Sequence, residues 1–195
     1  MNDKKLKSVS KFLSLVLRHQ PETIGVELDE NGWVSVQTLL DALKQSGKQV
    51  DLTLLQRVVH ENTKQRFTFS DDSLKIRANQ GHSIDIDLQL QPVEPPDVLF
   101  HGTVEKFLGS IREKGLIPGS RQHVHLSSDI ETATAVGTRR GKPVLLIVQS
   151  KQMHQAGNNF FLSKNGVWLT NHVAPKFIDF EMPDSSLRHL CAFFA

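Results

Sequence analysis

Arginine and histidine side chains that could hold an anion recur at three distant points of the chain. They lie in residues 17–21 (Leu-Arg-His-Gln-Pro), 64–67 (Lys-Gln-Arg-Phe) and 121–127 (Arg-Gln-His-Val-His-Leu-Ser), and no acidic residue interrupts these stretches. A guanidinium group carries a rigid fork of donors and keeps its charge at physiological pH, which suits a phosphate. A histidine beside it can titrate near neutrality. If the fold brings the three stretches together, we expect a phosphate site.

Each stretch alone also has an ordinary structural explanation. Arg18 and His19 fall on the last turn of an expected helix, where the helix dipole favours cations whatever they bind. Arg66 fits a surface charge at the start of a strand, and Arg121 fits a loop charge. The prediction of a phosphate site therefore depends on whether the fold brings the three basic stretches together.

The composition is that of an ordinary soluble protein, with 38% hydrophobic and 23% charged residues among 195. The net charge is +2, from 23 basic and 21 acidic residues, which is too small to identify a nucleic-acid partner. A single cysteine, Cys191, excludes an internal disulfide and suggests a reducing compartment. No apolar run reaches the roughly 18 residues of a membrane span, and no signal-peptide core follows the start. We expect a cytoplasmic protein without a membrane partner.

The first part of the chain predicts three helices followed by a hairpin. Apolar residues at helical spacing give the first helix, with Ser8 or Ser10 as its cap and Pro21 at its end. A second helix is expected from near Ser35 to Gly47, and a third begins near residue 51 or 53. Alternating residues at 67–69 and 74–77 flank a turn, which is typical of a hairpin. This order predicts a winged-helix module.

A proline-rich linker is expected at residues 89–97, and a mixed α/β pattern follows it. Strands are predicted at 98–100, 124–126 and 143–148, and a hairpin turns at residues 164–166. A helix is expected near residues 107–115. Another is expected to run to about residue 139, capped by Ser127 or Ser128.

Common nucleotide and metal motifs are missing. There is no G-x-G-x-x-G after a strand and no G-x-x-x-x-G-K-[ST], so neither a Rossmann site nor a P-loop is supported. Residues 137–141 fit a helix end better than a phosphate cradle. His123 and His125 are at most half of a zinc site, and cysteine ligands are absent. We expect no metal.

Five blocks of residues follow one another in a telling order. They are FLSLVLRH at 12–19, KQRF at 64–67, FHGT at 100–103, RQHVHLS at 121–127 and NGVWLT at 165–170. In this order they resemble the NAD-dependent RNA 2′-phosphotransferases, the tRNA 2′-phosphotransferase family. The resemblance runs from about residue 7 to residue 180, and residues 29–34 and 79–83 also look like family blocks.

The resemblance implies an α+β protein made of two lobes. It implies a winged-helix RNA-binding lobe at residues 1–90, a proline-rich linker at 91–97 and an NAD-binding lobe at 98–181. The second lobe would have a mixed α/β fold like that of the ADP-ribosyltransferases. Residues 182–195 would form a C-terminal tail.

The resemblance also implies a transferase of tRNA splicing that works by ADP-ribosylation, with NAD as co-substrate. The 2′-phosphate of the RNA attacks the anomeric carbon of the nicotinamide ribose and expels nicotinamide. The adjacent 2″-hydroxyl then attacks the phosphorus, which gives RNA with a free 2′-hydroxyl and ADP-ribose 1″,2″-cyclic phosphate. The expected partners are tRNA-like RNA carrying a 2′-phosphate and NAD, and we expect a monomer.

The family's catalytic set corresponds to Arg18, His19, Arg66 and Arg121. Arg18 and Arg66 would clamp the 2′-phosphate, and His19 would hydrogen-bond it and serve as acid or base in the second step. Arg121 would stabilise the transesterification, because fixed cations stabilise charge developing on phosphoryl oxygens.

The NAD-binding candidates lie on three expected strands of the second lobe. The family's histidine on the first of these strands helps to hold the adenosine part of NAD. The candidates are His101, Gly102, Thr103, His125, Ser127 and Val167.

Residues 165–169 lack the glutamate that protein-modifying ADP-ribosyltransferases commonly carry on the third motif strand. A phosphate nucleophile needs no base, and a carboxylate beside it would repel it. The missing glutamate therefore favours a phosphate acceptor.

Two other functions stay open at this point. One is an ADP-ribosyltransferase that acts on nucleic-acid phosphates or on protein. The other is a non-catalytic winged-helix binder of nucleic acid, although Asp41 and Glu61 dilute the positive charge of Lys44 and Arg57 on its helices.

Overall fold

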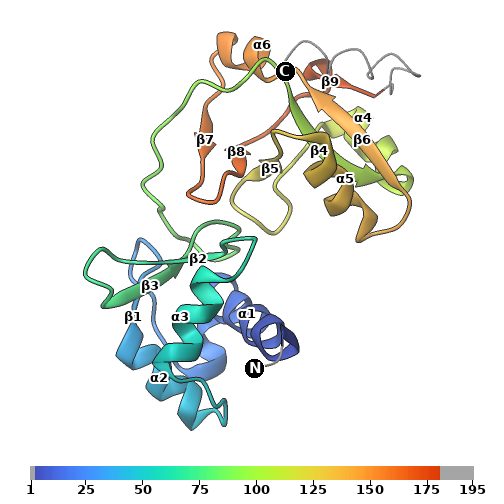
Figure 1. The fold of residues 1–195 in the computed structure, drawn as a ribbon. Coiled ribbons are helices and arrows are strands. Elements are labelled where there is room, and N and C mark those ends of the chain that lie inside the picture. Colours follow the sequence, from blue (N-terminus) through green and yellow to red (C-terminus); the bar gives the residue numbers. More distant parts are fainter. Residues whose placement is uncertain (1–2, 181–195) are drawn as a thin grey trace. The chain divides into compact units, whose positions relative to one another are not determined.

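The computed structural model describes residues 3–180, and their contacts divide the chain into two units (Figure 1). Unit 1 is the chain up to Gln91 together with residues 119–123 and 162–166. Unit 2 is residues 92–118, 124–161 and those from 167 onward. Two short segments of the second half of the chain thus group with unit 1. The predicted tail, residues 182–195, lies outside the described residues.

Helix α1 (Asp3–Arg18) buries one apolar face, with Leu13, Val16 and Leu17 fully inaccessible to solvent. The expected cap at Ser8 or Ser10 is wrong, because the helix is already formed at its first described residues. Ser10 instead lies inside the helix and is buried there. Pro21 follows the helix as expected and begins a short 3-10 turn, η1 (Pro21–Ile24).

The other two predicted helices are confirmed, and each begins after a residue whose side chain caps it. Helix α2 (Val36–Gln45) begins after Ser35, whose hydroxyl accepts from the amide of the third residue on. Helix α3 (Leu52–His60) begins after Asp51, whose carboxylate accepts the Leu54 amide at 2.7 Å. Such caps satisfy amides that have no partner within the helix.

The predicted hairpin of unit 1 is also confirmed. Strands β2 (Phe67–Phe69) and β3 (Lys75–Ala78) pair antiparallel, and β1 (Val34–Ser35) pairs with the other edge of β3. Val34 and Phe69 lie opposite Ile76 from its two sides. These side chains belong to the same apolar core as those of the three helices. Three helices and a hairpin are what a winged helix requires, and the assignment to that fold stays a prediction.

Unit 2 contains two three-stranded sheets. The first, in the order β4-β6-β9, consists of β4 (Leu99–Val104), β6 (Pro143–Val148) and β9 (Ile178–Asp179). The second, in the order β5-β8-β7, consists of β5 (Val124–Leu126), β8 (Trp168–Thr170) and β7 (Phe160–Leu162). A bridge between Phe100 and Ser127 connects β4 to the segment that follows β5.

Short helices complete unit 2. Their buried side chains, such as Ile111 and Met153, join those of the strands in a second core. The helices are η2 (Glu105–Phe107), α4 (Leu108–Lys114), α5 (Ile130–Thr138), α6 (Ser150–Gln155) and η3 (Pro175–Phe177).

Helix α5 lies unusually close to strand β4. A Cβ atom added to Gly102 would lie 1.8 Å from the carbonyl oxygen of Ala133, so only glycine fits there. The expected caps Ser127 and Ser128 are wrong, because Asp129 caps α5 by accepting the Thr132 amide at 2.6 Å.

Candidate functional site

Arg18, the last residue of α1, is a buried cation without a counter-ion. Its side chain is 9% exposed and forms no ion pair within residues 3–180. One guanidinium nitrogen, Nη2, donates to the Arg66 carbonyl at 3.4 Å, and the buried Nε has no hydrogen-bond partner. Burial, followed by the charges of Arg66 and Arg121, lowers the pKa of Arg18 to about 10. A bound anion would relieve this unfavourable environment.

Arg66 reaches α1 from the loop that precedes β2. Its Nη1 donates to the Ser10 hydroxyl at 3.2 Å, so a serine in the middle of α1 holds the guanidinium in place. The preceding residue, Gln65, has a φ of 37°, a left-handed conformation that is uncommon for a residue with a side chain. This turn directs Arg66 back toward Arg18.

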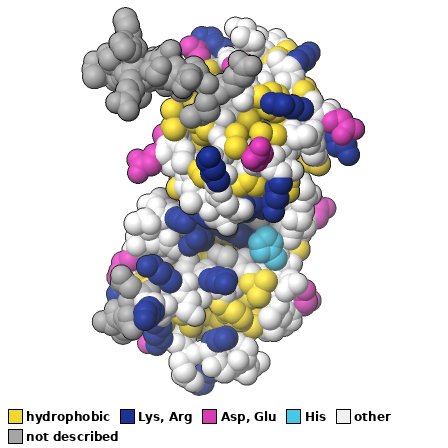
Figure 2. Space-filling model, turned by 90° about the vertical axis from the view of Figure 1, so that its right-hand side faces the viewer, with side chains coloured by type: hydrophobic (Ala, Val, Ile, Leu, Met, Phe, Trp, Pro, Cys, Tyr) yellow, Lys and Arg dark blue, Asp and Glu magenta, His cyan; other side chains and the backbone are white. Residues whose placement is uncertain are grey.

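Arg121 lies in residues 119–123, which group with unit 1 rather than with the second lobe in which the sequence placed it. Its charge lowers the pKa of both Arg18 and His19. Since Arg66 also acts on Arg18, the three basic stretches converge within unit 1. Figure 2 shows a face of the molecule on which Lys and Arg side chains gather around a histidine.

His19 follows α1 and is partly exposed. Its Nδ1 and the Ser83 hydroxyl are joined by a hydrogen bond of 2.9 Å. Partial burial, followed by the charges of Arg18 and Arg121, lowers the pKa of His19. The imidazole is therefore neutral at pH 7 until an anion offsets these cations.

A loop at residues 79–83 follows β3, and only its resemblance to a family block singled it out in the sequence. Asn79, Gln80 and His82 are buried, with exposed fractions of 7%, 9% and 1%. In the described part of the chain, Asn79 Oδ1, Gln80 Oε1 and both ring nitrogens of His82 have no hydrogen-bond partner. Burial, followed by the charges of Arg18, His19 and Arg77, lowers the pKa of His82 to about 4. Unsatisfied buried polar atoms are rare away from functional sites, so this loop belongs to the candidate site.

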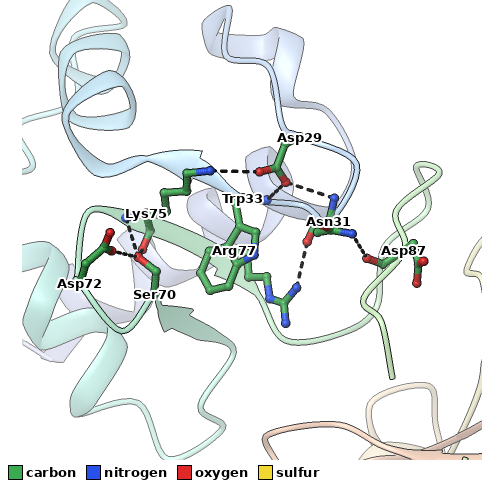
Figure 3. A network of polar contacts seen from close by, with 8 residues as sticks. All are labelled: Asp29, Asn31, Trp33, Ser70, Asp72, Lys75, Arg77 and Asp87. Atoms are coloured by element: carbon green, nitrogen blue, oxygen red, sulfur yellow. Dashed lines mark hydrogen bonds and ion pairs between the residues drawn. The ribbon is translucent and has the colours of Figure 1, made fainter. Parts of the chain in front are cut away.

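A polar network fixes the chain on both sides of this loop (Figure 3). Before the loop, Arg77 stacks 4.4 Å from the centre of the Trp33 ring and donates to the Asn31 carbonyl at 3.1 Å. After the loop, the carbonyl of Asp87 accepts from Asn31 Nδ2 at 2.9 Å. The turn that carries Asn31 is itself held by Asp29, whose Oδ1 accepts the Asn31 and Trp33 amides.

The segment of residues 162–166 reaches the second basic stretch. Asn165 Nδ2 donates to the carbonyl of Lys64 at 3.0 Å, two residues before Arg66. Gly166 has a φ of 75°, which the turn needs. Asn165, the first residue of the family block at 165–170, thus supports the basic stretch at residues 64–67.

Three of the NAD-binding candidates lie together in unit 2. His101 on β4 is hydrogen-bonded through Nδ1 to the carbonyl of His125 on β5 at 3.1 Å. Ser127 pairs its amide and carbonyl with Phe100, the neighbour of His101. Burial lowers the pKa of His101, against the opposing effect of the His125 carbonyl. At pH 7 the His101 ring is therefore neutral.

The other three candidates are placed differently. Gly102 allows the close approach of α5, so packing accounts for this glycine whatever else it does. Thr103 is buried on β4, and Val167 precedes β8. Their contribution to NAD binding stays a prediction.

Residues 3–180 contain neither a cluster of metal ligands nor a membrane-spanning helix. No three His, Cys, Asp or Glu side chains in this part of the chain are grouped so that they could hold a metal ion. None of the described helices is long and apolar enough to cross a membrane.

Comparison with known proteins gives consistent matches over most of the chain. The profile of the RNA 2′-phosphotransferase, Tpt1 / KptA family matches residues 4–172. A Probable RNA 2′-phosphotransferase of Flavobacterium johnsoniae is 54% identical over 181 residues, covering 93% of this chain and 100% of the relative. Those of Hahella chejuensis and Rhodopirellula baltica are 53% and 54% identical, over 90% and 91% of this chain and 95% and 97% of the relatives.

Proposed function

The chain belongs to the RNA 2′-phosphotransferase, Tpt1 / KptA family, and from that premise we propose that it transfers an internal 2′-phosphate of RNA to NAD. In the first step the 2′-phosphate displaces nicotinamide and becomes linked to ADP-ribose. In the second, the ribose 2″-hydroxyl attacks the phosphorus. The RNA leaves with a 2′-hydroxyl, and ADP-ribose 1″,2″-cyclic phosphate is the other product.

The observation that carries this proposal is the uncompensated burial of Arg18 beside two further arginines. A cation with an unpartnered buried Nε and a lowered pKa favours a ligand that brings negative charge. Within residues 3–180, Arg18 donates only to the Arg66 carbonyl, at 3.4 Å, so the rest of its fork of donors is available to phosphate oxygens. Such a cluster suits a phosphoryl group better than it suits a neutral substrate.

Each step of the proposed reaction makes a demand that these side chains can meet. In the first step the nucleophile is already an anion, so it needs placement more than deprotonation. Arg18 and Arg66 supply that placement. In the second step, negative charge grows on the phosphoryl oxygens, and Arg121 stabilises it without having to reorganise. His19 is the titratable group and exchanges protons in the second step.

NAD is proposed as co-substrate, held by residues of unit 2. Support comes from three neighbouring family motif residues, His101 on β4, His125 on β5 and Ser127 directly after β5. We also propose that unit 1 is a winged-helix RNA-binding lobe and that unit 2 has the ADP-ribosyltransferase fold. A cytoplasmic, monomeric enzyme that needs no metal completes the proposal.

The test is a reaction of the protein with NAD and a short RNA that carries one internal 2′-phosphate. We expect loss of the RNA phosphate to be matched by nicotinamide and ADP-ribose cyclic phosphate, with full activity in the presence of a chelator. Release of inorganic phosphate without NAD would overturn the proposal. RNA that keeps ADP-ribose indefinitely would indicate an ADP-ribosyltransferase of nucleic-acid phosphates instead.

A matched pair of variants ties the activity to the candidate site. Arg66→Ala should abolish turnover, because it removes one clamp of the 2′-phosphate. Arg57→Ala removes an arginine that is paired with Glu61 on the surface of α3, and its activity should equal that of the wild type. Normal turnover by Arg66→Ala would contradict the proposed role.

A further inference from the structure

The loop of residues 79–83 is hydrogen-bonded to each of the three basic stretches. At its start, the Asn79 amide donates to the Arg66 carbonyl at 2.9 Å. The Asn79 side chain donates through Nδ2 to the Gln65 carbonyl at 2.6 Å. These two bonds hold the left-handed turn at Gln65 that orients Arg66.

The end of the loop holds the first stretch. The Ser83 amide donates to the Arg18 carbonyl at 2.9 Å, and the Ser83 hydroxyl meets His19 Nδ1 at 2.9 Å. One residue thus contacts the backbone of the buried cation and the ring of its neighbour. Between these ends, the His82 carbonyl accepts from the Gln122 amide, next to Arg121, at 3.2 Å.

The loop can orient these stretches because it is itself anchored at both ends. Arg77 and Asp87, on its two sides, are both hydrogen-bonded to Asn31 (Figure 3). The interior of the loop is buried, with His82 only 1% exposed. A short segment that is pinned at both ends and buried between them loses little further entropy when it holds a catalytic group.

The contact between Ser83 and His19 leaves the two ring nitrogens unequal. Nδ1 is engaged by the Ser83 hydroxyl, whereas Nε2 makes no hydrogen bond to residues 3–180. A hydroxyl can donate to a neutral Nδ1 and can also accept from a protonated one. His19 can therefore gain or lose a proton without losing its partner, as a group that exchanges protons must.

We propose that Ser83 is a positioning residue, whose hydroxyl holds Nδ1 of His19 so that Nε2 is the nitrogen that meets the 2′-phosphate of the RNA. This inference rests on the proposed function and adds to it the orientation of the titrating ring. The charged and titratable groups that act on the ring are Arg18 at the end of α1, Arg121 in residues 119–123 and His82 in the loop.

The first readout is the ¹⁵N spectrum of the His19 ring, assigned with His19→Gln and recorded with 2′-phosphorylated RNA in the absence of NAD. At an alkaline pH, at which the ring stays neutral with and without RNA, we expect the RNA to move the Nε2 resonance and to leave Nδ1 nearly unchanged. In Ser83→Ala both nitrogens should shift toward values averaged over the two tautomers. A shift confined to Nδ1 in the wild type, or an unchanged ring in Ser83→Ala, would overturn the inference.

The second readout is the kinetic effect. Ser83→Ala should lower kcat by about 10- to 100-fold, within the contribution of a well-placed acid or base, and change KM by less than about threefold. Ser83→Thr keeps the hydroxyl and should recover most of the loss. Ser46→Ala, which removes a serine hydroxyl bonded to the Leu43 carbonyl at the end of α2, serves as control and should behave as wild type.

The two readouts separate failure of this inference from failure of the proposed function. If the wild-type protein does not process the RNA with NAD, the proposed function is wrong, and the spectrum of His19 still decides the role of Ser83. If the wild type is active but Ser83→Ala matches it in kcat, Ser83 has no positioning role. If Ser83→Thr is as impaired as Ser83→Ala while both melt like the wild type, the hydroxyl is not the group that matters.

Discussion

Replacing Arg18 by methionine should make the protein more stable while it destroys the phosphate site. Methionine keeps the length and flexibility of the arginine stem but brings no charge. The lowered pKa of Arg18, about 10, means that the folded protein disfavours the charged side chain. Keeping this guanidinium charged in the folded protein therefore costs roughly 3 kcal/mol of folding stability, because each unit of pKa shift is about 1.4 kcal/mol.

The sign of this effect follows from the direction of the shift. Arg18 is a base whose pKa is lower in the folded protein, so folding opposes its protonation. The cost is fully present below about pH 10 and disappears only at more alkaline pH. The variant also loses the hydrogen bond to the Arg66 carbonyl, which at 3.4 Å is worth about 1 kcal/mol or less. A net stabilisation of about 2 kcal/mol remains at pH 7.

The assay is thermal unfolding at pH 7, with and without sodium phosphate. Arg18→Met should melt about 4–8 °C higher than the wild type, since 1 kcal/mol shifts Tm by roughly 2–4 °C in a chain of this size. Phosphate should raise the Tm of the wild type and leave that of the variant unchanged. Arg57→Met, which removes a half-buried arginine paired with Glu61, is the control and should gain no stability. A variant that melts below this control would refute the reasoning.

Three further predictions concern other parts of the molecule. Gly102→Ala should lower Tm by more than about 10 °C or prevent folding, because the added Cβ would lie 1.8 Å from a backbone oxygen. Gly109→Ala, in α4 with open space around it, is its control and should raise the free energy of unfolding by about 0.5–1 kcal/mol. Between pH 7 and pH 5, the wild type should lose up to about 2 kcal/mol more of its free energy of unfolding, measured in urea, than His82→Gln does. The reason is that the pKa of His82 in the folded protein, about 4, lies below the ordinary 6.5, so protonation favours the unfolded chain. Arg121→Ala should accumulate ADP-ribosylated RNA when labelled NAD is used, and loss of both steps without this intermediate would contradict a role in the second step alone.

Local patterns predicted most helices and strands, because their signals lie within a few neighbouring residues. The apolar face of α1 and the start of α3 near Asp51 are of this kind. The errors arose where a residue had a tertiary partner that its neighbours do not reveal. Ser10 was expected to be a cap, but its hydroxyl accepts from Arg66 across the core of unit 1. Helix α6, with six residues, is too short for a helical periodicity to stand out.

The residue types of the candidate site could be predicted, but their convergence could not. A guanidinium group has the chemistry for a phosphate wherever it stands, so Arg18, Arg66 and Arg121 could be selected from the sequence. That Arg121 groups with unit 1 depends on contacts between residues far apart in the chain, such as the hydrogen bond from the Gln122 amide to the His82 carbonyl. The loop of residues 79–83 was noticed only as a family block, because a polar run is normally exposed and the burial of Asn79, Gln80 and His82 depends on the rest of the fold.

The membership of residues 119–123 and 162–166 in unit 1 bears on how this protein could be divided or recombined. A gene fragment that stopped at the proline-rich segment would encode the three helices and the hairpin but not the Arg121 guanidinium or the amide of Asn165 that supports Lys64. The two halves of this chain therefore cannot be exchanged independently of each other. Grafting a foreign second half onto residues 1–91 would preserve the reaction only if the donor carried both inserts at matching positions.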